Sequence, residues 1–238
     1  MSKCPGRGSF SVLRGLALLL VLFALNWLPS WASAEDNPGE QASDPGRSSV
    51  VCFGDSITRR GFPEVMGRLL DVEAVNAGVP GHTSSQGLRR IEKDVLDKNP
   101  DIVVVLFGTN DIRVDSDKYV PQKRYAENLR SIVAQCRAGD SRVVLCTPPP
   151  IATAPYFTRH DKTVFDRAGG LTKLLGDYRA TVIDVAKEEG VAVVDLFTLL
   201  QTDDGWLSRD GVHPSEQGSE MIAKHIAGVV KPLLAGDE

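Results

Sequence analysis

The chain has 238 residues, of which 42% are hydrophobic and 24% are charged, and its formal net charge is −4. These fractions are ordinary for a soluble globular protein, and they exclude a collagen, a coiled coil, a disordered chain and a membrane protein with many spans. The acidic balance also gives no basic surface of the kind that binds nucleic acid.

The first 34 residues have the three parts of a secretory signal peptide. Three basic residues precede an apolar run over residues 16–25, and the small-residue triplet Ala32-Ser33-Ala34 follows. The run is shorter than the ~20 apolar residues that span a bilayer as a helix. We therefore expect cleavage after Ala34 rather than an uncleaved anchor, and a secreted or periplasmic protein without membrane contact. Residues 35–47 carry no large apolar side chain, which predicts a flexible linker.

Three cysteines follow the predicted cleavage site: Cys52, Cys136 and Cys146. Two of them lie within valine-rich apolar runs, where a free cysteine packs as a small hydrophobic side chain. The sequence has no C-x-x-C pair and no Cys/His cluster with metal-ligand spacing. We expect neither a disulfide framework nor a metal site, and no cofactor.

From residue 48 onward, short apolar runs alternate with stretches of helical spacing. The apolar runs are residues 50–53, 72–75, 102–107, 143–146 and 191–194, and the helical stretches are 63–70, 84–96, 125–136, 171–189 and 215–234. Such runs read as strands that are covered on both faces, as in parallel sheets. The alternation predicts one α/β domain over residues 48–238, a three-layer α/β/α sandwich with a mainly parallel five-stranded sheet.

Four short segments follow predicted strands or precede the last helix. They are Gly54-Asp-Ser-Ile-Thr58, Asn76-Ala-Gly78, Gly108-Thr-Asn-Asp111 and Asp210-Gly-Val-His-Pro214. In open parallel sheets, ligands bind just beyond the carboxyl ends of the strands. We therefore expect these segments to meet at one site.

The four segments together supply the parts of an acyl-transfer site. Ser56 is a hydroxyl nucleophile, and His213 is the base that would activate it. Asp210, three residues before His213, would fix the imidazole tautomer and stabilise the imidazolium. The backbone N–H groups of Ser56 and Gly78 and the side-chain amide of Asn110 would donate to the oxyanion.

In their order, the four segments resemble the blocks of the SGNH (GDSL-like) hydrolase family, and the resemblance spans residues 54–214. It implies a flavodoxin-like sandwich and the same site residues. These are the triad Ser56, His213 and Asp210 and an oxyanion hole of Ser56, Gly78 and Asn110. One departure is Ile57, which stands where the family's name-giving block has leucine, a swap that conserves volume. A G-x-S-x-G nucleophile elbow is absent from the sequence, which argues against the larger α/β-hydrolase fold.

Four further residues are candidates for substrate binding: Tyr156, Phe157, Trp206 and His82. The first two lie in an aperiodic stretch, residues 148–170, after the fourth predicted strand, and loops there set specificity. Trp206 forms a rim or packs under the loop that carries Asp210, and the sequence leaves both open. For His82 the sequence leaves two positions open: it lines the cleft, or it is exposed at the start of a helix.

The sequence therefore predicts an exported, cofactor-free serine esterase that forms an acyl-enzyme. It lacks a long apolar insertion that could form a lid, which favours small acyl groups, such as acetyl on a carbohydrate, over long lipid chains. A lysophospholipase, a thioesterase and an O-acyltransferase would use the same residues and remain alternatives. A non-catalytic carbohydrate-binding module is disfavoured, because it has no need of a complete triad. The expected partner is a small-molecule or glycan ester, and the oligomeric state stays open.

Overall fold

The computed structural model describes residues 48–202 and 204–236, so the predictions for residues 1–34 and 35–47 lie outside the described residues. The described chain is built on one sheet. Its strands are β1 (Ser49–Gly54), β2 (Glu73–Gly78), β3 (Ile102–Leu106), β4 (Arg142–Cys146) and β5 (Ala192–Val194). They lie in the order β2-β1-β3-β4-β5, and every neighbouring pair is parallel. This is the flavodoxin-like order, and the predicted fold class is confirmed.

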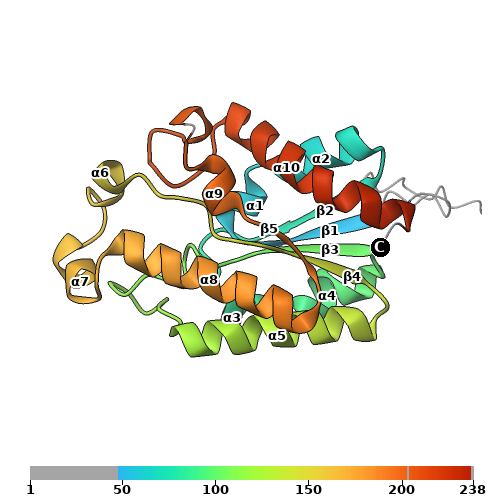
Figure 1. The fold of residues 1–238 in the computed structure, drawn as a ribbon, viewed down its shortest axis with the longest axis horizontal. Helices are drawn as coiled ribbons and strands as arrows, with labels where there is room; N and C mark the ends of the chain where they lie inside the picture. Colours follow the sequence, from blue (N-terminus) through green and yellow to red (C-terminus); the bar gives the residue numbers. More distant parts are fainter. Residues whose placement is uncertain (1–47, 203, 237–238) are drawn as a thin grey trace, which may run out of the picture. The chain divides into compact units, whose positions relative to one another are not determined.

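Helices cover both faces of the sheet (Figure 1). Figure 1 shows α2 (Phe62–Leu70), α9 (Leu196–Leu200) and α10 (Glu216–Ala235) on one side, and α3 (Ser84–Leu88), α4 (Ile91–Asp94), α5 (Gln122–Ala138) and α8 (Leu171–Glu189) on the other. The shorter helices are α1 (Ser56–Arg59), α6 (Thr153–Tyr156), α7 (Lys162–Arg167) and the 3₁₀ turns η1 (Leu96–Lys98) and η2 (Asp204–Trp206). In the described ranges, no helix has the length and apolar character needed to cross a membrane.

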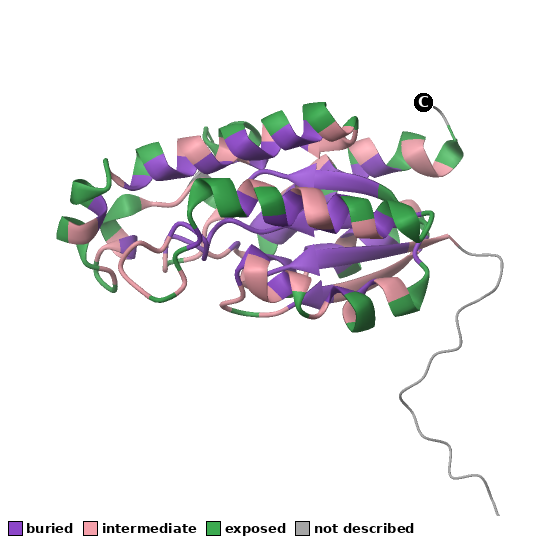
Figure 2. Ribbon diagram, turned by 90° about the horizontal axis from the view of Figure 1, so that it is seen from below, coloured by how far each residue is buried: buried purple, intermediate pink, exposed green. Residues whose placement is uncertain are grey.

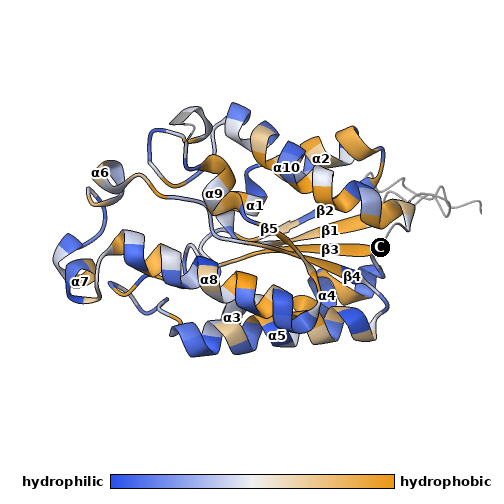
Figure 3. Cartoon of the chain, in the orientation of Figure 1, coloured by the Kyte–Doolittle hydropathy of each residue, from blue (hydrophilic) through white to orange (hydrophobic). Residues whose placement is uncertain are grey.

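The strands are buried on both faces (Figure 2) and carry mostly apolar side chains (Figure 3). In β1, Val50 and Cys52 pack in the core under α2 and α10, whereas Val51 and Phe53 pack in the core over α5 and α8. This alternation follows from the two-residue period of a strand. The three cysteines of this part of the chain are buried and free, as predicted.

The prediction of one continuous helix over residues 84–96 is wrong. The structure breaks it into α3, α4 and η1, and Arg90 between α3 and α4 has φ −122°. The break turns the Arg90 side chain inward, where it binds the ends of two strands. By contrast, the helix over residues 171–189 is confirmed, and Gly190 ends it at φ 59°.

The strand order places two functional segments side by side. From β1 the chain moves to β2 at the edge of the sheet and then crosses to β3 on the opposite side of β1. Ser56 follows β1 and Asn110 follows β3, so both stand at the point where the order reverses. In doubly wound sheets this switch point is where ligands bind.

Candidate active site

Ser56, His213 and Asp210 form one hydrogen-bonded line. Nε2 of His213 lies 2.8 Å from Oγ of Ser56, and Nδ1 of His213 lies 2.6 Å from Oδ2 of Asp210. Ser56 and His213 are separated by 157 residues, and both side chains are only half-buried. The arrangement can move a proton from the serine hydroxyl to the imidazole while the carboxylate balances the charge.

The first turn of α1 fixes the position of Ser56. Asp55 ends β1, and its Oδ1 accepts the N–H of Ile57 at 2.9 Å, which caps α1. The turn is packed tightly against two strands. A Cβ on Gly54 would lie 2.4 Å from the carbonyl oxygen of Leu106, and one on Gly78 would lie 2.4 Å from the backbone nitrogen of Arg59. Glycine at both positions lets the strand ends approach the turn that carries Ser56.

The loop 208–213 fixes Asp210 and His213. Oδ1 of Asp210 accepts hydrogen bonds from Ser208 Oγ, Val212 N and His213 N, each at 2.9 Å. Partial burial would raise the pKa of Asp210, but these bonds and the one to the imidazole together hold it well below its usual range. These bonds therefore favour the carboxylate form of Asp210.

Asn110 lies next to this line, on the turn after β3. Its side-chain Nδ2 donates to the carbonyl oxygen of His82 at 3.1 Å and to Oδ2 of Asp55 at 3.3 Å. Asp55 directly precedes Ser56, so the amide of Asn110 is fixed close to the nucleophile. The longer bond, to Asp55, is the weaker of the two and the one that a substrate oxygen can replace.

Gly78 lies at the end of β2, next to the turn that carries Ser56. Its N–H donates to Oδ1 of Asn76 at 3.1 Å. The glycine also allows the close approach of α1 described above. In this structure the N–H of Gly78 and the amide of Asn110 each have a hydrogen-bond partner within the protein, so a role for either in the oxyanion hole stays a prediction.

Two buried carboxyl groups support the site. Burial raises the pKa of Asp55 to about 7, and the charge of Asp111 adds to this, while hydrogen bonds from Ile57 and Asn110 oppose it. Burial likewise raises the pKa of Asp111 to about 6, against hydrogen bonds from Ser84 and Gly108. Both groups bond loop amides, as expected for carboxyls that hold a turn in place.

Arg90 is the supporting residue that sequence reasoning missed. Its Nη2 donates to the carbonyl oxygen of Gly54 at 2.7 Å, and its Nη1 donates to that of Ala77 at 2.9 Å and to Asp94 at 2.7 Å. The guanidinium also lies over the Phe53 ring, 4.5 Å from its centroid. Arg90 thereby joins the ends of β1 and β2.

Arg90 also fixes the ring of His82. Its Nε donates to Nδ1 of His82 at 3.2 Å, which leaves the proton of the neutral ring on Nε2. Partial burial lowers the pKa of His82, and the nearby charges of Arg90, Arg89 and Lys118 lower it further. His82 is thus joined to the supporting framework twice, through its ring to Arg90 and through its backbone carbonyl to Asn110.

Two of the predicted substrate-binding residues lie in the interior. Trp206 is 1% exposed, and its side chain packs in the core under α10. Its backbone lies so close to α10 that a Cβ on Gly218 would collide with the Trp206 carbonyl group. Tyr156 is 2% exposed and stacks on His160 with ring centroids 4.0 Å apart. Trp206 therefore takes the packed position, one of the two that the sequence left open, and the ring of Tyr156 lies in the core. Phe157 is half-buried and lines a cavity.

In the described part of the chain, no group of three or more His, Cys, Asp or Glu side chains is arranged to hold a metal ion. The chemistry available at the site is that of the serine, the imidazole, the carboxylate and the amide donors.

Comparison with known proteins agrees with this geometry. Residues 52–221 match the model of the GDSL-like lipase/acylhydrolase family. The isoamyl acetate-hydrolyzing esterase 1 homolog of Rattus norvegicus is 32% identical over 201 residues, which cover 74% of this chain and 79% of that protein. An acetylxylan esterase of Xylanibacter ruminicola is 28% identical over 86% of this chain and 46% of its own length. The crystal structure of a lipase/acylhydrolase from Enterococcus faecalis is similar with a TM-score of 0.67 and 26% identity, covering 77% of this chain and 95% of that one.

Proposed function

Since the chain belongs to the GDSL-like lipase/acylhydrolase family and is a carboxylic ester hydrolase, we propose that it works through Ser56, His213 and Asp210 and an acyl-enzyme. The observation that carries the proposal is the unbroken line from Ser56 Oγ through His213 to Asp210, with contacts of 2.8 and 2.6 Å. Residues 48–238 would form the catalytic domain.

The reaction follows from the order of these contacts. Oγ of Ser56 attacks the ester carbonyl carbon, and its proton moves to Nε2 of His213. The negative charge on the former carbonyl oxygen is met by Ser56 N–H and Asn110 Nδ2. The carbon–oxygen bond to the alcohol then breaks, and the alcohol takes the proton from His213. A water molecule repeats the sequence on the acyl-serine and releases the acid, which restores Ser56.

For the substrate we propose a small acyl group, acetyl above all, carried by a carbohydrate. Two relatives support an acetyl ester, since one is named for isoamyl acetate and the other for acetylxylan. The chain also has no long apolar insertion that could cover a lipid chain. We further propose export, with cleavage after Ala34 and residues 35–47 as a linker. The composition of the first 34 residues supports this.

The test compares the purified protein with its Ser56→Ala variant. Both are assayed on p-nitrophenyl acetate, butyrate and octanoate and on acetylated xylan, with acetate release recorded. We expect turnover that depends on Ser56 and falls as the acyl chain lengthens. A preference for octanoate would move the substrate to lipid or thioester, and acetylated product in the presence of an acceptor sugar would make the protein an acyltransferase. Absence of any Ser56-dependent turnover from a folded sample would contradict the mechanism.

A further inference from the structure

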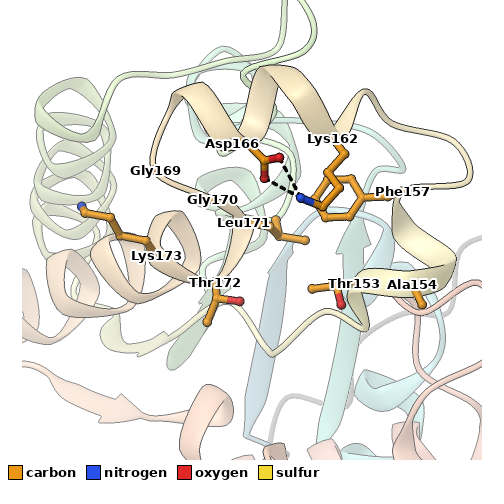
Figure 4. A pocket seen from close by; sticks show the side chains of 10 residues that line it. All are labelled: Thr153, Ala154, Phe157, Lys162, Asp166, Gly169, Gly170, Leu171, Thr172 and Lys173. Carbon is orange, nitrogen blue, oxygen red and sulfur yellow. Dashed lines mark hydrogen bonds and ion pairs between the residues drawn. The ribbon is translucent and has the colours of Figure 1, made fainter.

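An open cavity of about 530 Å³ lies between α6, α7 and the start of α8 (Figure 4). This volume is within the ~300–1,000 Å³ usual for small-molecule sites. Figure 4 shows the Phe157 ring beside the Lys162–Asp166 pair on one side of the opening, with Thr153 and Thr172 on the other. Leu171 is the buried apolar residue between them.

The cavity is attached directly to the loop that carries His213. The N–H of Ala152, next to α6, donates to the carbonyl oxygen of Gly211 at 2.9 Å. A Cβ on Gly211 would lie 2.4 Å from Cγ of Pro155, so α6 packs against the loop without a gap. Arg159, just after α6, donates from Nη2 to the carbonyl oxygen of Asp210 at 2.6 Å. One short helix, α6, thus contacts the loop that carries His213 with one side and lines the cavity with Thr153, Ala154 and, just after it, Phe157.

The lining suits a sugar better than an alkyl chain. Phe157 presents an aromatic face that is half-buried, and the hydroxyls of Thr153 and Thr172 and the charged ends of Lys162 and Asp166 surround it. A pyranose ring has the matching pattern, with apolar C–H groups on its faces and hydroxyls around its edge. An alkyl chain would cover these polar groups without giving them hydrogen bonds, which is unfavourable.

The charges in the lining are paired. Nζ of Lys162 lies 2.7 Å from Oδ2 of Asp166, and Nζ of Lys173 lies 2.6 Å from Oδ2 of Asp177. Each ammonium group is thus already neutralised by a carboxylate four residues along its helix. Such a lining offers an acidic sugar no unpaired cation, so an uncharged sugar fits it better.

We propose that this cavity is a subsite for uncharged sugar units on the alcohol side of the ester. The inference rests on the proposed function, and it adds where the leaving glycan binds. The bound sugar would hold the ester bond at Ser56, so the subsite would raise turnover of oligosaccharide esters and not of small esters.

Two matched tryptophan variants test the subsite. Ala154→Trp places a large side chain in the cavity, whereas Ala168→Trp makes the same change directly after α7 at an exposed residue that does not line it. The measured quantity is the ratio of kcat/KM on an acetylated xylooligosaccharide to kcat/KM on p-nitrophenyl acetate. We expect Ala154→Trp to lower the ratio about tenfold or more, and Ala168→Trp to leave it within about twofold of the parent. Phe157→Leu, which removes the ring but keeps apolar volume, should lower the ratio in the same direction.

A binding measurement separates this inference from the proposed function. In the Ser56→Ala variant, an NMR titration with unacetylated xylooligosaccharide should shift signals from α6, α7 and the first turn of α8, and adding Ala154→Trp should abolish the shifts. An unchanged ratio in both Ala154→Trp and Phe157→Leu, with turnover that still depends on Ser56, would overturn the subsite alone. Tighter binding of an acidic oligogalacturonide than of the neutral sugar would also overturn it. Loss of Ser56 dependence on p-nitrophenyl acetate would instead be a failure of the proposed function.

Discussion

The two sides of the site are built in different ways. At the ends of β1 and β3, Ser56 and Asn110 are fixed by the buried carboxyls Asp55 and Asp111 and the half-buried Arg90. The second side, residues 148–170, lies outside the sheet and packs through its aromatic rings. Tyr156, Phe157, His160 and Phe165 contact one another with ring centroids 4.0 to 6.4 Å apart, and Tyr156 and Phe165 extend the core that lies over α5 and α8.

This difference indicates which positions tolerate substitution. The strand ends belong to the main core, so a substitution there alters the reacting atoms and the stability of the whole domain. In segment 148–170 the buried rings Tyr156 and Phe165 join the core, and His160 pairs with Asp115, with Nδ1 and Oδ2 2.8 Å apart, whereas the residues that line the outer cavity are mostly exposed. These outer residues can change with little effect on the chemistry, which is how one scaffold serves several substrates.

The largest expected effect at the strand ends follows from Asp210→Asn. An amide can donate as well as accept, so it would favour the wrong imidazole tautomer and remove the charge that balances the imidazolium. We expect kcat to fall by about 10³–10⁴-fold with the fold retained. Steady-state kinetics with a thermal melt tests this. Unchanged kcat would mean that Asp210 does not orient His213.

The second largest effect on turnover is expected when the side-chain amide of Asn110 is removed. Asn110→Ala should lower kcat by about 10²–10³-fold with a small change in KM, because the donor acts on charge that develops only after attack. Kinetics on p-nitrophenyl acetate measures the split between kcat and KM. A loss confined to KM would show that Asn110 binds the substrate and does not stabilise the oxyanion.

Substitution of Arg90 tests whether its hydrogen bonds to the ends of β1 and β2 stabilise the turn that carries Ser56. Arg90→Met removes the guanidinium bonds to the carbonyl groups of Gly54 and Ala77, of which Gly54 keeps the N–H of Val79 as a donor, and we expect a loss of about 2–4 kcal/mol in the free energy of unfolding. The neighbouring Arg89→Met is the matched control, since Arg89 is exposed. Urea unfolding compares the two. Equal losses would contradict the role given to Arg90.

The buried carboxyl of Asp55 makes stability depend on pH. Its pKa is raised from 3.8 to about 7, so the native state binds a proton that the unfolded state has released over this interval. The contribution of Asp55 to stability is therefore complete below about pH 4 and is lost as the pH rises toward 7. As the pH rises across this interval, we expect the free energy of unfolding of Asp55→Asn to increase relative to that of the wild type, by up to a few kcal/mol. Urea unfolding at pH 4.5, 6 and 8 measures it, and a pH-independent difference would contradict the account.

The smallest effect is expected on the second side of the site. Lys162 and Asp166 are 62% and 53% exposed, so their ion pair is screened by water. Lys162→Ala should change the free energy of unfolding by less than about 1 kcal/mol. A thermal melt measures this, and a loss as large as that of Arg90→Met would remove the contrast between the two sides.

The sequence predicted the first side well and the second poorly, for physical reasons. Val- and Ile-rich runs and turn-forming segments mark parallel strands and their ends, so Ser56, Asn110, Asp210 and His213 could be found. The burial of Trp206 and Tyr156 could not be predicted, because an aromatic residue near a site can face inward or outward and local spacing does not distinguish the two.

Arg90 was missed for a different reason. On a continuous helix over residues 84–96, at 100° per residue, it stands about 160° from Leu88, 100° from Ile91 and 140° from Val95, and so faces away from the apolar side. The break after α3 reverses that direction, and the pattern of apolar residues does not reveal the break.

The most direct test of the central claim is to label the nucleophilic serine covalently, since its oxygen displaces fluoride from a fluorophosphonate and forms a stable phosphonyl-serine. The protein is reacted with a fluorophosphonate ester, digested and examined by mass spectrometry. The account predicts one adduct per chain, on Ser56, whose rate of formation falls sharply in His213→Ala, and no adduct in Ser56→Ala. An adduct on another residue, or labelling of Ser56 at the same rate without His213, would contradict it.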